Sequence, residues 1–390
     1  MDNKTQYQAE LFSNRLKKKY KELRKWARKN RISCYRLYDR DIPEIPVSLD
    51  LYEFLPGDVQ TPVEAARFLG EQNSKLSAND LSVEADIKER TFAILYLYER
   101  PYEKDDSEEA EWLNSMAEAA QNVLGIEQSH ILKKYRKHQD HKNNQYEKDD
   151  DNKQILINHE LVQECGQIFK INLSSYLDNG LFFDHRPLRS TLRETCSNKS
   201  VLNLFCYTGS FSVYAAQGNA KRVESVDLSN TYLEWTKENL KNNGFIDKKK
   251  YIITRADCIR FLQEKAVAQK QILTGNADAE TTAKAQTYDI IILDPPTFSN
   301  SKNTANILDI NKDWPQLVKD CLNILNENGV LYFSTNSTRL KFDINQIPPF
   351  TVSGYRIESK DITEETIPND YAGNKPHRCW KFTVKREKTF

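Results

Sequence analysis

The sequence of 390 residues predicts an α/β protein: a doubly wound, Rossmann-like sheet of seven strands, preceded by a small α+β domain and an N-terminal basic helix. From residue 201 onward, short apolar runs of strand character alternate with longer segments of helical spacing, which is typical of a mostly parallel sheet with helices on both faces. Between residues 35 and 176, strand patterns instead flank one long helical segment. We therefore expect domain limits of 1–34, 35–176 and 177–390.

The overall composition indicates no class of partner, because 56 basic and 56 acidic residues balance. Seven scattered cysteines form no C-x-x-C pair, so neither a disulfide framework nor a zinc site is expected. His138 and His141 lack a third clustered ligand, and no metal is expected there either. The sequence has no apolar run near the roughly 20 residues that span a bilayer, nor a signal-like N-terminus, so a cytoplasmic location without membrane partners is expected.

The charge is concentrated at the N-terminus, where residues 1–40 contain thirteen Lys and Arg against four Asp and Glu. Within residues 11–31, an apolar stripe recurs at helical spacing, at Leu16, Tyr20, Leu23 and Ala27. The bases around it are too numerous to be paired along the helix, which favours contact with phosphates over a merely solvated face. The candidate contacts are Lys17, Lys18, Lys21 and Lys25.

The following domain shows four strand patterns and one helix. The predicted strands are 46–52, 91–99, 129–135 and 167–172, and the predicted helix is 106–124. Two polar stretches, 73–86 and 139–153, are expected to be loop-like insertions.

In the C-terminal domain, seven strands are predicted at 201–205, 222–227, 251–256, 288–293, 330–335, 354–360 and 379–385. Gly209, Asp227, Asp257 and Asp294 each lie at the C-terminal end of one of these strands or in the turn after it. Ligands of open α/β sheets bind at this edge, near the point where the strand order reverses. We therefore treat the four residues as one candidate site.

The spacing within this site indicates the kind of ligand. Asp227 follows Gly209 by 18 residues, about where an acidic residue meets ribose hydroxyls in nucleotide-binding folds. A dinucleotide would require G-x-G-x-x-G, and the turn contains only Gly209. After Asp294, Pro295 and Pro296 must end the strand in a stiff turn. A ligand with a ribose and no pyrophosphate fits better, and S-adenosylmethionine is such a ligand.

Segments along nearly the whole chain resemble the bacterial 23S rRNA (guanine-N7)-methyltransferase, often the C-terminal half of a fused, two-activity rRNA methyltransferase. The segments are FSNRLKK (12–18), YRLYDRDIPE (35–44), DNGLFFDHRPLR (178–189), NLFCYTGSFSVYAA (203–216), VDLSNTYLEWTKENLKNNGF (226–245), ILDPPTFSNSK (292–302) and HRCW (377–380). The resemblance implies a class I methyltransferase fold, S-adenosylmethionine as cofactor, and 23S rRNA or a large-subunit precursor as partner. It also implies guanine N7 as the target. Independently of the resemblance, we expect a monomer or a homodimer, between which the sequence does not decide.

The resemblance assigns roles to the residues of the site. Asp184 and Arg186 are expected near the methionine end of the cofactor, with an interdomain salt bridge as the alternative, and Asp257 near the adenine, with helix capping as the alternative. The other expected cofactor residues are Asn203, Phe205, Tyr207, Thr208, Gly209, Asp227, Leu228, Cys258 and Asp294. The candidate catalytic residues are Asp294, Pro295, Pro296 and Phe298, and those for RNA are Thr297, Phe298, Asn300, Lys302 and Asn336.

Several alternatives stay open. Another base nitrogen, such as guanine N2, is one; a cytosine C5 target is another, but it needs a cysteine at the substrate face, where the D-P-P turn carries Thr297. An RNA-binding assembly factor without turnover is a third, against which the intact Asp227, Asp257 and Asp294 argue. Guanine N7 carries a lone pair and no proton, so it needs no general base. Its methylation should therefore be nearly independent of pH from about pH 6.5 to 9.

Overall fold

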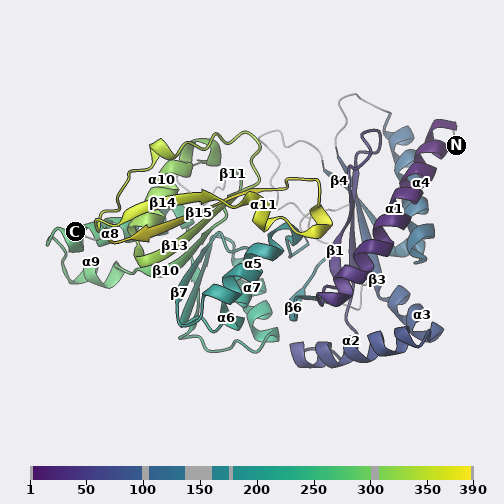
Figure 1. Cartoon of the computed structure of the whole chain (residues 1–390), viewed down its shortest axis with the longest axis horizontal. Coiled ribbons are helices and arrows are strands. Elements are labelled where there is room, and N and C mark those ends of the chain that lie inside the picture. The colour runs from purple at the N-terminus through teal and green to yellow at the C-terminus, as the bar shows by residue number, and fades with distance from the viewer. Residues whose placement is uncertain (1–2, 99–104, 137–159, 175–178, 300–306, 388–390) are drawn as a thin grey trace. The chain divides into compact units, whose positions relative to one another are not determined.

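In the computed structural model, which describes residues 3–98, 105–136, 160–174, 179–299 and 307–387, the chain forms two compact units (Figure 1). Unit 1 comprises residues 1–183 and 369–374, and unit 2 comprises residues 184–368 and 375–390. The expected domain limit lay after residue 176, and the expected C-terminal domain was continuous. The chain instead divides between Phe183 and Asp184, and six residues near the C-terminus belong to unit 1.

Unit 1 is built on a four-stranded sheet with the order β1-β2-β3-β4. Its strands are β1 Cys34–Asp39, β2 Val47–Glu53, β3 Thr91–Tyr98 and β4 Ile131–Arg136. The first three are antiparallel, and β4 runs parallel to β3 because α4 (Asp106–Leu124) connects them. Apolar residues of α4, of α1 (Asn3–Lys29) and of the sheet share one core.

Helix α1 confirms the predicted amphipathic pattern. Leu16 and Ala27 of the apolar stripe are buried, and Tyr20 and Leu23 are partly buried against the same core. The helix begins at Asn3, earlier than the pattern indicated, because Phe12 continues the buried stripe toward the N-terminus. The basic residues lie on the opposite, polar face of the helix.

Three expectations for unit 1 were wrong or incomplete. Residues 73–86 are not a loop, because α2 (Pro62–Ser77) and α3 (Leu81–Glu89) cover most of them. Thr61 starts α2 with a capping box, and Asp80 caps α3, so local hydrogen bonds specify helices whose faces are mostly polar. β1 was not predicted, and β6 (Gln167–Lys170) pairs with β5 (Leu161–Glu164) outside the main sheet. The 139–153 stretch lies outside the described residues.

Unit 2 confirms the predicted doubly wound fold. Its sheet has the order β14-β15-β13-β10-β7-β8-β9, and β15 is antiparallel to both of its neighbours. The strand order reverses between β7 and β10, and the carboxyl ends of the strands at such a reversal are where open α/β sheets bind their ligands. The strands are β7 Ser200–Leu204, β8 Arg222–Asp227, β9 Tyr251–Arg255, β10 Tyr288–Leu293, β13 Leu325–Thr335, β14 Arg356–Asp361 and β15 Arg378–Lys385.

Successive strand residues of unit 2 enter separate cores on the two faces of the sheet. Ile291 and Leu293 belong to the core shared with α8 and α10, whereas Ile290 and Ile292 belong to the core shared with α5 and α6. The helices of unit 2 are α5 Arg186–Thr195, α6 Ser210–Gln217, α7 Asn230–Asn242, α8 Cys258–Leu273, α9 Ala279–Lys284, α10 Ile310–Asn323 and α11 Thr363–Thr366. A short ribbon of β11 Phe298–Ser299 and β12 Leu308–Asp309 follows β10. Among the described residues, no helix has the length and apolar character needed to cross a membrane.

Candidate active site

The turn between β7 and α6 has an unusual backbone. Phe205, Tyr207 and Gly209 have φ values of 54°, 51° and 75°, a region that residues with a side chain rarely adopt. A Cβ on Gly209 would lie 2.4 Å from Cγ2 of Thr236 on α7, so glycine is required there on steric grounds as well. Such strained turns occur at ligand sites, because they bring the backbone close to the bound group.

Asp227 ends β8 and joins this turn. Its carboxylate accepts the backbone N–H groups of Tyr207 at 3.0 Å and Ser229 at 2.9 Å. Burial raises the pKa of Asp227 above its ordinary value, although these hydrogen bonds oppose the rise. A carboxylate has about four acceptor positions, so further donors can bind this partly desolvated group.

The residues after β9 connect the neighbouring strand end to the same turn. Asp257 caps α8 by accepting the N–H of Ile259 at 3.0 Å, which confirms the capping role left open by the sequence. The next residue, Cys258, is buried, and its sulfur accepts the N–H of Phe205 at 3.2 Å. Burial raises the pKa of Cys258 well above its ordinary value, so the group is a neutral thiol.

Three other predicted cofactor residues lie in or beside the turn. Asn203 is buried, and its amide donates to Ser212 Oγ at 2.9 Å. Thr208 is also buried, and its carbonyl accepts from the Asn239 amide at 2.9 Å. Leu228 directly follows Asp227 and is partly exposed. Asn203 and Thr208 thereby hold the turn in place from within the fold.

Asp294 follows β10, next to the end of β7, because Leu293 pairs with Leu204. One carboxylate oxygen accepts the hydroxyl of Ser334, and the other lies 3.3 Å from Nε2 of His185. Burial alone would raise the pKa of Asp294, but His185 and Ser334 outweigh it and hold this pKa below its ordinary value. Asp294 is therefore a fixed, ionised carboxylate.

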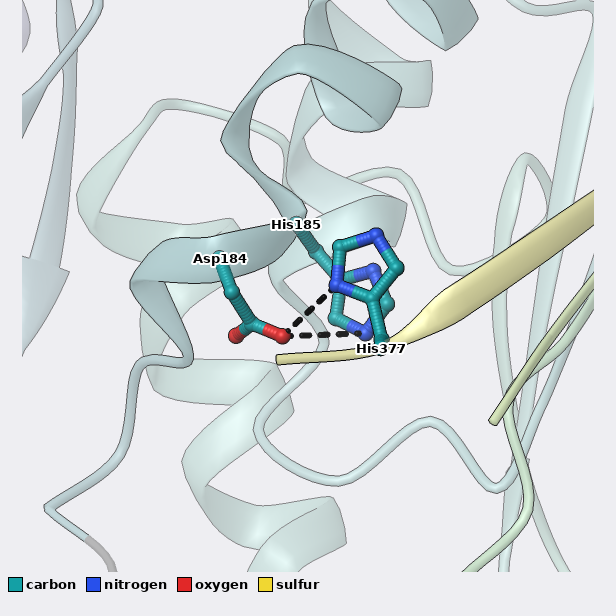
Figure 2. A group of neighbouring side chains, drawn as sticks. All are labelled: Asp184, His185 and His377. Atoms are coloured by element: carbon teal, nitrogen blue, oxygen red, sulfur yellow. Dashed lines mark hydrogen bonds and ion pairs between the residues drawn. The ribbon is translucent and has the colours of Figure 1, made fainter. Parts of the chain in front are cut away.

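Asp184, His185 and His377 form a compact group (Figure 2), and His185 connects this group to Asp294. Nδ1 of His377 donates to Oδ2 of Asp184 at 2.9 Å, and Nε2 of the same ring bonds Thr366 Oγ1 at 2.9 Å. The two imidazole rings stack with centroids 4.3 Å apart and planes inclined by 19°. Burial would raise the pKa of Asp184, but the two histidines hold it well below its ordinary value.

This group does not fit a metal ion, although its donor atoms lie within 4.8 Å of one another. A metal lies close to the plane of each imidazole that binds it, at about 2.0–2.1 Å from nitrogen for zinc. Two stacked rings have separate, nearly parallel planes and cannot direct both lone pairs at one ion. The contacts are those of a hydrogen-bonded network, which we call the histidine network (Asp184, His185, His377 and Asp294).

The candidates for RNA are only partly brought together. Thr297 Oγ1 is hydrogen-bonded to Asn336 Oδ1, so these two residues are neighbours at the carboxyl edge of the sheet. Phe298 keeps 38% of its surface exposed, and Asn336 is exposed too. Asn300 and Lys302 lie outside the described residues. Lys17, Lys18, Lys21 and Lys25 are all exposed on α1 of unit 1.

Pro295 is buried and Pro296 partly buried, which gives Asp294 a rigid support. Arg186, at the start of α5, is 3% exposed. Two residues of the site, Ser334 and His377, were not foreseen. His377 precedes β15, the antiparallel strand, which starts at the edge where the parallel strands end: Arg378 pairs with Thr335. Only this topology, and no local motif, indicates that His377 lies beside Asp184 and His185.

Comparison with known proteins agrees with this geometry. The S-adenosylmethionine-dependent methyltransferase family matches residues 129–345. The ribosomal RNA large subunit methyltransferase K of Neisseria meningitidis is 35% identical over 374 residues, which are 96% of this chain and 87% of that protein. The K/L protein of Magnetococcus marinus is also 35% identical over 96% of this chain, but this chain spans only 43% of that relative.

Solved structures show the same fold. SMU.776, a methyltransferase complexed with SAH, aligns with a TM-score of 0.63 and 20% identity, over 96% of this chain and 82% of that one. A SAM-dependent methyltransferase from Streptococcus mutans aligns with a TM-score of 0.62 and 19% identity, over 96% and 81%.

Proposed function

The chain belongs to the S-adenosylmethionine-dependent methyltransferase family that includes the ribosomal RNA large subunit methyltransferases K, and on this premise we propose that it methylates N7 of a guanine in 23S rRNA. The cofactor is S-adenosylmethionine. The turn at Gly209 and the carboxylate of Asp227 would hold it: ribose hydroxyls donate to Asp227, and the backbone of the strained turn approaches the ligand.

The state of Asp294 is the observation that favours N7. An exocyclic amine must lose a proton during or after its attack on the methyl group, whereas N7 attacks with a free lone pair. Asp294 has a lowered pKa and both of its oxygens are already bound, so it is a poor proton acceptor. Its negative charge would instead stabilise the positive charge on the transferred methyl group and on the methylated base. Transfer to N7 then requires only that the two reacting atoms and the leaving sulfur are in line.

The cytosine C5 alternative is weakened by the thiols of unit 2. That chemistry needs a thiolate at the substrate face. Cys206, Cys258 and Cys321 are all buried, and burial raises the pKa of each thiol well above its ordinary value. None of these cysteines follows β10, where the base would be presented, and Thr297 stands there instead.

Unit 1 would supply a second contact with RNA through α1. Lys19 and Arg15 of this helix are bound to Asp41, but no ion pair involves Lys17, Lys18, Lys21 or Lys25 among the described residues. Lys17, Lys21 and Lys25 recur every four residues, so they form one exposed stripe that can follow a phosphate backbone. Phe298 would stack on the unpaired target base.

Methyl transfer to transcripts of large-subunit rRNA made with guanosine or with 7-deazaguanosine tests this proposal. We expect transfer to the first transcript and none to the second, because carbon replaces N7 in the analogue. Competition by the 7-deaza transcript should show that it still binds. Transfer to both would identify another atom, such as guanine N2. Binding of both transcripts without turnover of S-adenosylmethionine would favour a non-catalytic assembly factor.

A further inference from the structure

The histidine network joins segments that are far apart in the sequence of unit 2. Asp184 and His185 end the short 3₁₀ helix Phe183–His185, His377 precedes β15, and Asp294 follows β10. The ring of His185 also packs against Phe211 of α6, with centroids 5.7 Å apart, two residues after Gly209. The network therefore links the cofactor turn, the D-P-P turn and the last strand of the sheet.

His185 occupies the centre of this network. Its Nε2 lies 3.3 Å from Asp294 and 3.8 Å from Asp184, so one cationic ring can serve two carboxylates. The other ring nitrogen, Nδ1, is buried and finds no hydrogen-bond partner among the described residues. A buried unpaired polar atom destabilises the fold, so attraction to the two carboxylates must offset this cost.

Four groups face the ring of His185 and decide its protonation. Asp294 and Asp184 favour the cation, Arg189 of α5 disfavours it, and His377 stacks on its face. Burial lowers the pKa of His185, but the two carboxylates outweigh burial and raise this pKa above its ordinary value. His377 in turn fixes Asp184, because Nδ1–H binds the carboxylate and Thr366 holds the opposite nitrogen.

We propose that His185 and His377 are positioning residues for methyl transfer: the His185 imidazolium fixes the carboxylate of Asp294, and His377 orients Asp184 as the second anion that holds His185. This inference rests on the proposed function, since it assigns how Asp294 is kept in place. With Ser334 on one oxygen and His185 on the other, the carboxylate cannot rotate. Loss of the proton on His185 removes the charge that holds it.

The network changes the expected dependence on pH. Attack by N7 requires no deprotonation, so the rate should not rise with pH. The rate should fall as the pH rises through the raised pKa of His185, because the cation is present below that pKa and lost above it. The nearly flat profile expected from the sequence should therefore hold only on the acidic side of this transition.

To test this proposal, the single-turnover rate of methyl transfer is measured as a function of pH, with cofactor and RNA at saturating concentrations. His185→Gln keeps an N–H donor for Asp294 and removes the charge. We expect a rate at least about tenfold lower near neutral pH, and no alkaline fall. His130→Gln removes a partly buried histidine of unit 1 and should keep the wild-type profile. A His185→Gln variant with the wild-type rate and profile would overturn the proposal.

Two variants of His377 separate its hydrogen bond from mere packing. His377→Asn can still donate to Asp184 from nearly the same position as Nδ1, whereas His377→Ala cannot. We expect the Asn variant to transfer the methyl group several times faster than the Ala variant at equal occupancy. Equal rates would contradict a positioning role for His377.

Imidazole titration by NMR tests the network without any activity. The pKa of His185 should lie above the ordinary value of a histidine, and Asp294→Asn should lower the pKa of His185. An unshifted His185 in the wild type, or one insensitive to Asp294→Asn, would overturn the proposal. If the wild-type protein methylates another atom, the proposed function falls, while the comparison of variants and the titration still decide the role of the histidines.

Discussion

Single residues of unit 2 show how the strand ends are joined into one site. The backbone N–H of Tyr207 binds Asp227, and the N–H of Phe205 binds the sulfur of Cys258, so the strained turn is held by the two neighbouring strands. Each of these bonds satisfies a backbone donor that positive φ angles turn away from helix and sheet. The turn is therefore held in one conformation before the cofactor that we propose for it binds.

Asp227 should be essential for binding the cofactor. Asp227→Ala removes the acceptor that we assign to the ribose hydroxyls, and we expect calorimetry to show at least about tenfold weaker binding of S-adenosylmethionine. Glu234→Ala, an exposed acid on α7, is the matched control and should bind normally. Unchanged affinity of Asp227→Ala would remove this residue from the site.

Gly209 should be required for its lack of a side chain as well as for its φ angle. Gly209→Ala forces a Cβ into Thr236, whereas Gly244→Ala has an equally unusual φ of 82° and no atom within 4 Å of the added Cβ. The second variant should lose only about 1–2 kcal/mol of stability. Gly209→Ala should lose more than this and bind S-adenosylmethionine more weakly. Equal thermal stability of the two variants would show that Thr236 yields easily.

At the scale of the elements, α1 is a basic helix attached by one apolar stripe. Burial of Phe12, Leu16 and Ala27 fixes which face points to the core, and so leaves Lys17, Lys18, Lys21 and Lys25 exposed. The exposed lysines can therefore be replaced by neutral residues without disturbing the buried face of the helix. This separation makes its role in binding testable.

Replacing these four lysines by glutamine should weaken RNA binding and its dependence on salt. Each lost phosphate contact should lower the slope of log affinity against log salt by about 0.7–0.9. Replacement of Lys241, Lys248, Lys249 and Lys270, which are exposed in unit 2, removes the same charge and serves as control. Equal slopes for the two quadruple variants would return α1 to the role of a solvated surface.

The elements that were predicted from the sequence share a physical property: each buries enough apolar residues to give a clear strand or helix periodicity. The strand Tyr288–Leu293 is apolar except for Asp289 because both faces of the parallel sheet are covered, and it was predicted at its observed limits. Helices α2 and α3 bury few residues and depend on their caps, so their polar composition resembled a loop. β5 and β6 are short and pair only with each other.

The residues of the candidate site also fall into those that the sequence could predict and those that it could not. Asp227 ends β8, Asp294 directly follows β10, and Gly209 lies in the turn after β7, so the fold class alone brings these residues to one edge of the sheet. Ser334 reaches Asp294, and His377 reaches Asp184, through the pairing of β13 and β15 with the rest of the sheet, a long-range register that no local pattern reveals. The stacking of His185 on His377 could not be foreseen for the same reason.

At the scale of the whole molecule, the chain combines unit 1, which carries the basic helix, with unit 2, which carries the proposed cofactor site. It matches nearly all of the K protein of Neisseria meningitidis but less than half of the fused K/L proteins. The proposed activity therefore concerns only the matched part of the fused relatives and makes no claim about the rest of their length. Unit 1 would supply affinity for RNA, and unit 2 the cofactor and Asp294.

Identification of the methylated nucleoside tests this proposal most directly. The purified protein is incubated with labelled S-adenosylmethionine and unmodified large-subunit rRNA, and the RNA is digested to nucleosides and analysed by mass spectrometry. We predict that the label appears in 7-methylguanosine, and that Asp294→Asn forms the same nucleoside more slowly. Label in 2-methylguanosine or 5-methylcytidine, or none in the RNA, would contradict the central claim.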